Sequence, residues 1–310
     1  MSITEIEYDK KPLNLEIIKH EDFDEYVFNS PYEDIFYNFK KSTFYLFKPE
    51  KFVKGDIIFL HGIGNGNIPF LMWYARYFRK LGYRTSFVIM PYHLSRTPEG
   101  EKAGDTFYSA EPCECVKKFH FAVKDVRRVI DILEGMPSYS SKRLYLMGMS
   151  FGGIIGSISL ALDQRISKGA LLVTGGNWRW INFHSPYTLK IKYEVETKGN
   201  SYGCTGELKC IEHFRKEPVK YILNNFKKIE DIFKLEHVGC YKYDPLSFAP
   251  FIEQEVLFLR AVFDKVIPKN ASLELKSLIK NVVYRRIPTG HKSSILLRKY
   301  IAKMVLKFFN

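Results

Sequence analysis

Residues 148–152, which read Gly-Met-Ser-Phe-Gly, constrain the fold of this chain more than any other stretch. A short apolar run over residues 143–147 precedes them, and an apolar, helix-like segment over residues 154–162 follows. This order predicts a buried strand, a sharp turn and a helix. Ser150 at the centre of such a turn needs a strained backbone, which the glycines two residues away on either side permit.

The predicted turn lifts the hydroxyl of Ser150 clear of the end of the strand, where it can attack a carbonyl carbon. The backbone N–H of Phe151, in the first turn of the following helix, then faces the oxyanion that forms. The alternative is an ordinary glycine-rich turn that contains a bystander serine.

The length and composition of the chain are those of a globular protein. Its 310 residues suffice for one large α/β domain with an insertion, or for two ordinary domains. The formal net charge of +13 favours anionic partners. The basic residues are spread along the chain, however, without a nucleic-acid motif, so we expect no nucleic-acid partner. A solvated basic surface is the main expectation, with a membrane surface or an acidic substrate as the alternatives.

The first thirteen residues contain three acidic residues and no long apolar run, so they resemble neither a signal peptide nor a transit peptide. No window of the sequence approaches eighteen apolar residues, so we expect no stable membrane insertion. The five cysteines lack a disulfide-scaffold spacing. These features together predict a cytoplasmic protein with reduced thiols. A zinc site made by Cys204, Cys210 and His213 is imaginable, but its spacing fits no standard pattern, and we expect no metal.

Strand-like and helix-like segments alternate along much of the chain. Predicted strands cover residues 56–60, 85–90, 169–174, 256–260 and 282–287, and predicted helices cover residues 69–81, 115–133, 271–279 and 297–308. Such alternation predicts a mostly parallel sheet covered by helices on both faces, with its active site at the carboxyl ends of the strands.

Two regions depart from this alternation. Residues 1–55 contain two weak strand-like runs, at residues 34–38 and 43–47, which we expect to extend the sheet. Residues 177–250 are rich in Lys, Tyr and Phe and lose the alternation, so we interpret them as a cap inserted after the sixth strand. The core domain then comprises residues 56–176 and 251–310.

These features resemble the α/β-hydrolase superfamily, in particular its esterases and lipases with an inserted cap. The resemblance covers roughly residues 56–175 and 251–310, and it implies a mostly parallel central sheet flanked by helices. In this family a serine, an acid and a histidine follow one another in the chain and form a catalytic triad. A serine needs such a partner because its hydroxyl is a poor nucleophile until a base takes its proton.

The resemblance assigns the histidine and the acid of the triad to two loops. His291 lies where the predicted last strand breaks into a loop, the place at which the family carries its histidine. Asp264 follows the end of the preceding strand in an Asp-x-x-x-Pro context similar to that of family members. Asp244 and Glu255 also precede His291 and remain rival acids, although one lies in the expected cap and the other before the strand.

The sequence His61-Gly62-Ile63-Gly64 follows a predicted strand and resembles the oxyanion loop of the family. In that loop the N–H of the residue after the His-Gly pair binds the oxyanion, which here implies Ile63, with Phe151 as the second donor. Glycine lets the backbone approach the substrate closely. We expect a structural role for His61; a plain tight turn is the alternative for the whole loop.

The substrate pocket is expected between the loop at residues 91–96 and the cap. Gly62, Tyr92, His93, Trp178 and Trp180 are its candidate lining residues, although the two tryptophans also fit a cap core. Arg96 and Arg179 could hold an anionic substrate group, or they could be solvated.

The resemblance implies a serine hydrolase that cleaves a carboxylic ester of a small-molecule acyl substrate, without a cofactor. A peptidase and a thioesterase or acyltransferase share the same triad and remain alternatives. A further alternative is a non-catalytic binding protein of this fold, because fold does not dictate function. The sequence contains no feature that fixes an oligomeric state.

Overall fold

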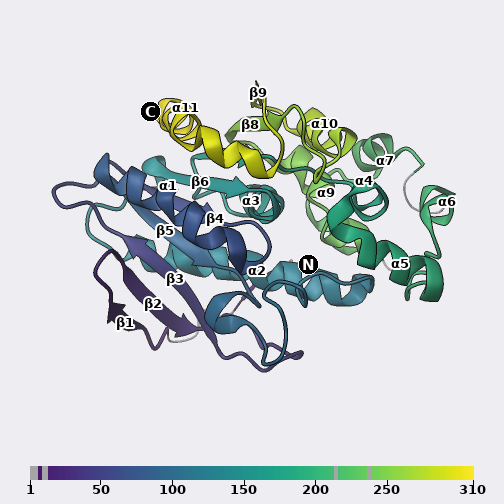
Figure 1. Ribbon diagram of the computed structural model, residues 1–310, viewed down its shortest axis with the longest axis horizontal. Coiled ribbons are helices and arrows are strands. Elements are labelled where there is room, and N and C mark those ends of the chain that lie inside the picture. Colours follow the sequence, from purple (N-terminus) through teal and green to yellow (C-terminus); the bar gives the residue numbers. More distant parts are fainter. Residues whose placement is uncertain (1–5, 9–12, 213–215, 236–238) are drawn as a thin grey trace.

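The computed structural model describes residues 6–8, 13–212, 216–235 and 239–310 of the chain. These residues form a nine-stranded sheet with helices on both faces (Figure 1). The strand order is β1-β2-β3-β5-β4-β6-β7-β8-β9. The strands are β1 (Glu16–Lys19), β2 (Asp24–Asn29), β3 (Lys41–Phe47), β4 (Gly55–Leu60), β5 (Tyr83–Ile89), β6 (Leu144–Met149), β7 (Lys168–Leu172), β8 (Glu255–Ala261) and β9 (Val282–Ile287).

The strands from β5 to β9 in this order are parallel, as predicted. Strands β4, β5 and β6 are buried along their whole length, as expected for strands covered on both faces. The register pairs Leu60 with Gly148 and Met149 with Leu172. The carboxyl ends of β4, β6 and β7 are therefore level, which brings the loops that follow them to one edge of the sheet.

The N-terminal region differs in part from the prediction. Strand β3 confirms the run at residues 43–47, but residues 34–38 form a turn instead of a strand. The reason is local, because the Asp34 carboxylate accepts hydrogen bonds from the N–H groups of Phe36 (3.0 Å) and Tyr37 (3.3 Å). Strands β1 and β2, which the sequence pattern did not indicate, join β3 in antiparallel pairing.

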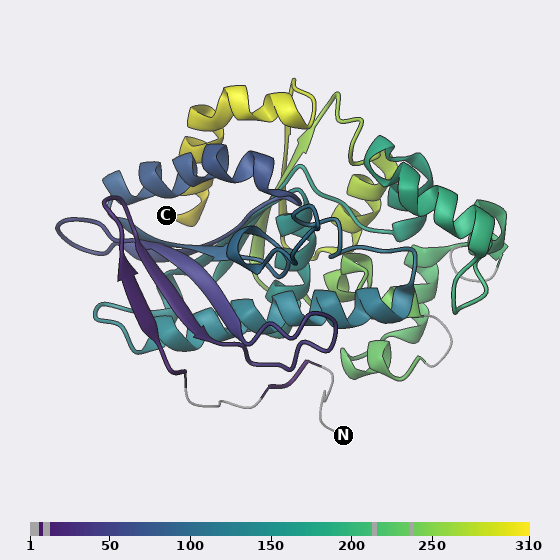
Figure 2. The ribbon, with the colours of Figure 1, turned by 60° about the horizontal axis from the view of Figure 1, so that its bottom comes forward.

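Two apolar cores separate the sheet from its helices. Helices α1 (Ile68–Lys80) and α11 (Arg298–Phe309) pack on one face. Helices α2 (Pro112–Glu134), α3 (Phe151–Leu162) and α10 (Lys269–Leu278) pack on the other. Figure 2 shows α1 and α11 on the side of the sheet opposite to α2. All five helices confirm the predicted periodic segments to within a few residues.

The chain between β7 and β8 lies at one end of the sheet in both views, drawn in green (Figures 1 and 2). It follows the seventh strand rather than the expected sixth, because the N-terminal region supplies three strands instead of two. In the part of this segment that the structure describes, every assigned element is helical. The longer ones are α4 (Trp178–His184), α5 (Leu189–Lys198) and α7 (Pro218–Asn225), and the short ones are α6 (Glu207–Cys210), α8 (Glu230–Phe233) and α9 (Pro245–Phe248).

None of the helices within the described ranges is both long enough and apolar enough to cross a bilayer.

Candidate active site

The turn that carries Ser150 lies between β6 and α3, as the sequence predicts. Ser150 has φ 56° and ψ −119°, a conformation that a residue with a side chain rarely adopts. Gly148 and Gly152 are needed because backbone atoms lie too close to them to leave room for a side chain. A Cβ atom on Gly148 would lie 2.3 Å from the Gly152 carbonyl oxygen, and one on Gly152 would lie 2.1 Å from the Leu60 carbonyl oxygen. Only glycine therefore fits at either position without moving the backbone.

Ser150, His291 and Asp264 form a continuous chain of hydrogen bonds. The Oγ atom of Ser150 lies 2.8 Å from Nε2 of His291, and Nδ1 of His291 lies 2.8 Å from Oδ2 of Asp264. A carboxylate can only accept, so Nδ1 carries the proton and donates to Asp264. Nε2 of the neutral ring is then an acceptor, and the Ser150 hydroxyl donates to it. The structure thus brings together three side chains predicted from three separate loops.

Asp264 is held in place by its own loop. Its second carboxylate oxygen, Oδ1, accepts from the N–H groups of Val266 at 2.8 Å and Ile267 at 2.9 Å. The side chain is only 3% exposed, and that of His291 is 13% exposed. The carboxylate is therefore shielded from water and points one oxygen at the imidazole in a fixed direction.

The two rival acids lie elsewhere. Asp244 is buried, and its carboxylate accepts from the backbone N–H groups of Asn177 (2.9 Å), Trp178 (3.1 Å) and Leu246 (2.9 Å). It thereby fixes the start of α4. Glu255 is exposed at the start of β8, 3.6 Å from Lys168. Neither acid is a hydrogen-bond partner of the histidine.

The loop after β4 passes over the candidate nucleophile. A Cβ atom on Gly62 would lie 3.6 Å from Cβ of Ser150 and 3.9 Å from its Oγ. Gly64 has φ +83°, so the turn requires glycine there as well. Within the described ranges, the N–H of Ile63 donates to no protein acceptor. The N–H of Phe151 belongs to the first turn of α3, where no intrahelical acceptor exists.

His93 holds this loop in position through a hydrogen bond. Its Nδ1 lies 2.8 Å from the Pro91 carbonyl oxygen, which must accept, so Nε2 is free to accept from the N–H of Gly64 at 2.9 Å. A second bond runs from the N–H of Leu94 to Oδ1 of Asn65 at 3.0 Å. The loop after β5 therefore positions the loop after β4. The sequence did not indicate this role of His93.

Both histidines behind this loop are neutral. His61 is fully buried, and its Nε2 accepts from the N–H of Met90 at 3.2 Å, in line with the structural role expected for it. Burial, and then the neighbouring His93, lower the pKa of His61 to about 3. Burial is likewise the main cause that lowers the pKa of His93 to about 4. At neutral pH each ring therefore keeps one acceptor nitrogen.

A cavity of about 890 Å³ opens at Ser150. Gly62 and Trp178 line it, as expected, together with His291 and the loop residue Ile63. The sequence did not single out its other apolar lining residues. Those from helices and strand ends include Leu71, Met149, Ile154, Val173, Ile181 and Ile191. Those on helices have the spacing of ordinary core residues, and those at strand ends continue ordinary apolar runs, so no sequence signal distinguished them.

Three residues expected in the pocket do not line this cavity. Tyr92 and His93 are buried behind the lining, where the Tyr92 hydroxyl donates to Asp34 at 3.1 Å. Trp180 points to α10, and its Nε1 donates to Glu274 at 2.8 Å. Other residues of the loop after β5 and of α4 line the cavity instead. Tyr92 and His93 support this lining from behind.

The two candidate anion-binding arginines are paired within the protein. Arg96 is buried, and its Nη1 lies 2.6 Å from the carboxylate of Asp125. Arg179 donates from Nε to Glu207 at 2.9 Å, and its guanidinium lies 4.1 Å from the ring centroid of Trp180. Neither lines the cavity at Ser150.

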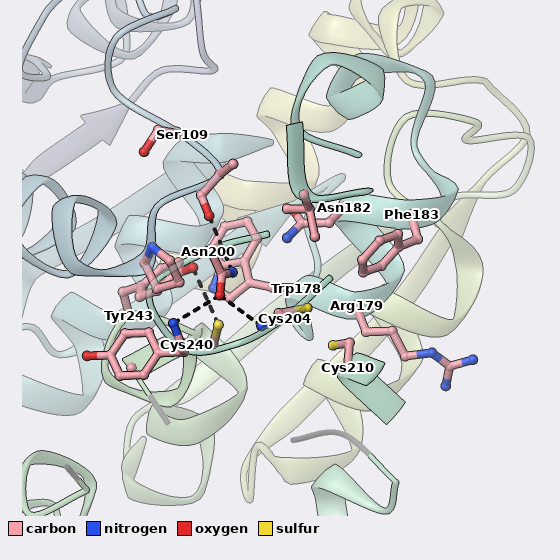
Figure 3. Close-up of a pocket in the computed structure, with 15 residues that line it drawn as sticks. Ser109, Trp178, Arg179, Asn182, Phe183, Asn200, Cys204, Cys210, Cys240 and Tyr243 are labelled. Carbon is pink, nitrogen blue, oxygen red and sulfur yellow. Dashed lines mark hydrogen bonds between the residues drawn. The ribbon is translucent and has the colours of Figure 1, made fainter. Parts of the chain in front are cut away.

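A second pocket of only about 20 Å³, room for a single water molecule, lies behind Trp178 (Figure 3). Cys204, Cys210 and Cys240 line it, and none of the five cysteines, which all lie in the described ranges, forms a disulfide. A hydrogen bond with the Cys210 thiol is the largest cause that lowers the pKa of Cys204 to about 7. His213, the third candidate zinc ligand, lies outside the described residues. Among those that are described, no group of three His, Cys, Asp or Glu side chains could hold a metal ion.

Comparisons with known proteins agree with this architecture. No model of a known protein family matches the chain, and no curated protein matches it in sequence. Solved structures do match. An acylaminoacyl peptidase from Pyrococcus horikoshii gives a TM-score of 0.59 at 16% identity over 97% of this chain, which spans 42% of that peptidase.

Two further structures cover most of both chains. An acetyl xylan esterase from Paenibacillus sp. R4 gives a TM-score of 0.59 at 12% identity, over 97% of this chain and 89% of the esterase. An enol-lactonase from Burkholderia xenovorans LB400 gives 0.53 at 18% identity, over 86% of this chain and 96% of the lactonase. The protein therefore has the fold of the α/β-hydrolase superfamily.

Proposed function

We propose that the protein is a serine hydrolase that cleaves a carboxylic ester through an acyl-enzyme. The observation that carries the proposal is the unbroken hydrogen-bonded chain from Ser150 through His291 to Asp264, at the edge of a large cavity. The geometry matches the requirement for nucleophilic catalysis, in which a base lies within hydrogen-bond reach of the hydroxyl and is oriented by a third group.

The first half of the reaction acylates the enzyme. Ser150 Oγ attacks the ester carbonyl carbon while Nε2 of His291 takes its proton. Asp264 keeps the imidazole in the required tautomer and stabilises the imidazolium that forms. The N–H groups of Ile63 and Phe151 donate to the oxyanion of the tetrahedral intermediate. His291 then returns the proton to the alcohol oxygen, the carbon–oxygen bond breaks, and the alcohol leaves.

The second half repeats these steps with water. His291 takes a proton from a water molecule that attacks the acyl carbonyl, and the same two N–H groups hold the new oxyanion. Collapse of this intermediate breaks the bond to Ser150 Oγ, which recovers its proton from His291. Every step uses groups of this chain and water alone.

We further propose that residues 177–250 act as a cap over the site. Trp178, Ile181 and Ile191 come from this segment and line the cavity next to residues of the core. A wall from an inserted segment excludes water from the reacting carbonyl, which strengthens the electrostatic interactions that stabilise the intermediate.

Rapid-mixing kinetics with an activated ester tests the proposal. An acyl-enzyme releases one equivalent of alcohol per active site in a burst when deacylation is slower than acylation. We expect Ser150→Ala to abolish both the burst and the turnover, whereas Ser277→Ala, a change of the same kind on the exposed face of α10, leaves them intact. Equal turnover by wild type and Ser150→Ala would overturn the proposal. No turnover of any ester or amide would favour a binding protein.

The similar structures include an acetyl xylan esterase, an enol-lactonase and an acylaminoacyl peptidase. The substrates that these names indicate all contain an acyl carbonyl group that a nucleophile can attack. An assay panel that contains esters, lactones and N-acyl aminoacyl amides therefore separates an esterase from a peptidase on this site.

A further inference from the structure

The inner part of the cavity at Ser150 has an apolar wall supplied by three helices. Phe151 and Ile154 come from α3, one turn apart, and Trp178 and Ile181 come from α4. Ile191 of α5 adds a fifth apolar side chain. These residues are all less than a tenth exposed, so the surface that they still present faces the cavity rather than bulk solvent.

Aromatic packing holds this wall in place. The ring of Phe119 lies edge-on to both Phe151 and Trp178, with ring centroids 5.4 Å away in each case. Tyr108 stacks on Trp178 at 4.8 Å. Because interlocked aromatic rings resist displacement, the space in front of them is preformed and does not depend on a bound ligand to open it.

Charged side chains are mostly kept away from this wall. Glu101, Asp105, Lys190 and Lys292 border the cavity but are exposed, and Glu194 is half-buried. Lys118 is the buried cation of the cavity, and its ammonium lies 2.8 Å from the carboxylate of Glu114. The buried cation of the cavity is therefore compensated by an anion within the protein.

The direction of proton transfer decides which half of the ester occupies this inner part. His291 must return its proton to the alcohol oxygen, so the alcohol leaves on the side of His291, where the exposed Lys292 borders the cavity. The acyl group remains bonded to Ser150. The apolar wall from α3 and α4 is then the part of the cavity that is left to receive it.

We infer that the substrate is an ester of a large apolar acyl group, of about six carbons or more, rather than an acetyl ester. This inference rests on the proposed function. A cavity of about 890 Å³ is the size of pocket that holds a drug-sized ligand, far larger than a two-carbon group requires. An acetyl group would leave the wall of Phe151, Ile154 and Trp178 in contact with water.

Two matched series of esters test the inference. In the first, the alcohol is always 4-nitrophenol and the acyl chain grows from acetyl to decanoyl. In the second, the acyl group is always acetyl and an unbranched alcohol grows by the same number of carbons. Burial of each methylene raises kcat/KM about fourfold. We expect the acyl series to rise about 250-fold between acetyl and hexanoyl, which differ by four methylenes, and then to level off, while the alcohol series changes by less than about tenfold.

A pair of isoleucine variants tests whether the dependence of kcat/KM on acyl-chain length arises at the apolar wall. Ile191→Phe fills part of the cavity, and Ile132→Phe makes the same change on α2, away from the cavity. The two positions are similarly buried, at 7% and 6% exposed. We expect Ile191→Phe to lower kcat/KM for decanoyl esters at least tenfold relative to acetyl esters. Ile132→Phe should leave the ratio unchanged, and thermal melts show that each variant is folded.

The outcomes separate this inference from the proposed function. Hydrolysis that depends on Ser150 but is flat or falls with acyl length overturns the inference and leaves the serine hydrolase standing. A rise in the alcohol series alone also overturns it, because the apolar wall would then hold the leaving group. Absence of any Ser150-dependent hydrolysis overturns both. The two ester series measured on wild type test the inference even if Ile191→Phe does not fold.

Discussion

His93 shows how a residue outside the cavity can control the reaction proposed here. Its Nε2 is the acceptor that holds the N–H of Gly64, one residue from the proposed oxyanion donor Ile63. Its Nδ1 is tied to the Pro91 carbonyl, so the ring cannot turn without breaking two bonds. We regard His93 as a positioning residue.

Removal of this acceptor is expected to weaken transition-state binding. We predict that His93→Ala lowers kcat by about tenfold to 100-fold with little change in KM, since loss of a whole oxyanion donor costs about 100-fold to 1000-fold. His93→Gln, whose amide oxygen can accept from Gly64, should recover much of the rate. A purely structural role would make both variants lose activity in proportion to their loss of folded protein, which circular dichroism measures.

In the proposed mechanism, Asp264 acts only through the imidazole of His291. Asp264→Asn keeps one oxygen for the N–H groups of Val266 and Ile267 but favours the wrong tautomer of the histidine. We expect kcat to fall by about 1000-fold to 10,000-fold. Asp244→Asn changes a rival acid that does not contact His291. If that variant loses as much turnover per folded molecule as Asp264→Asn, the assignment of the acid is wrong.

At the scale of elements, the site depends on how closely β4 and α3 approach one another. The backbone of Gly152 lies against the carbonyl of Leu60, so a methyl group there must push the helix away from the strand. We predict that Gly152→Ala lowers the free energy of unfolding by about 3 kcal/mol or more.

Gly66→Ala provides the control for this prediction. Gly66 is exposed in the short 3-10 helix Asn65–Asn67 after β4, and a Cβ atom there would meet no atom within 4 Å. Its free energy of unfolding should stay within about 0.5 kcal/mol of wild type in urea titrations. Comparable losses in the two variants would show that the close approach at Gly152 is unimportant.

The elements that the sequence predicted well are those whose signal is local. Strands β4 to β8 are mainly apolar runs that end in a loop, and the main helices repeat apolar residues at helical spacing. Strand β1 escaped prediction because its side chains are all exposed and only its pairing with β2 makes it a strand. The run at residues 34–38 was mistaken for a strand because the turn chemistry of Asp34 went unrecognised.

The residues of the candidate site likewise divide into those that the sequence predicted and those that it did not. Ser150, Asp264 and His291 were identified because each follows a strand in a recognisable local context, and parallel strands bring such loops to one edge. The role of His93 was not identified, because its partner Gly64 lies 29 residues away in the chain. The apolar wall of the cavity was also not predicted, because side chains that face a cavity and side chains that face the core have the same spacing along a helix.

At the scale of the whole molecule, buried neutral histidines couple stability to pH. Burial lowers the pKa of His93 from about 6.5 to about 4 in the folded protein. The unfolded chain therefore binds more protons between these values, so stability is fully present above pH 6.5 and is lost as the pH falls toward 4. His61 contributes in the same direction.

We predict that wild type loses about 2.5 kcal/mol more unfolding free energy than His93→Gln between pH 7 and pH 4.5, because glutamine does not titrate. Urea unfolding at several pH values in this range measures the difference. Ionisable groups other than His61, whose pKa His93 also lowers, are common to both proteins and cancel in the comparison. Parallel curves for the two proteins would mean that His93 is already accessible to protons in the folded state.

The proposed mechanism requires the Ser150 hydroxyl to be a nucleophile that His291 activates. The most direct test is reaction of the protein with a fluorophosphonate, followed by intact-mass measurement and peptide mapping. We predict a single adduct on Ser150 in wild type, formed at least about 1000-fold more slowly in His291→Gln and absent in Ser150→Ala. An adduct on another residue, or no adduct on the folded wild-type protein, would contradict the claim.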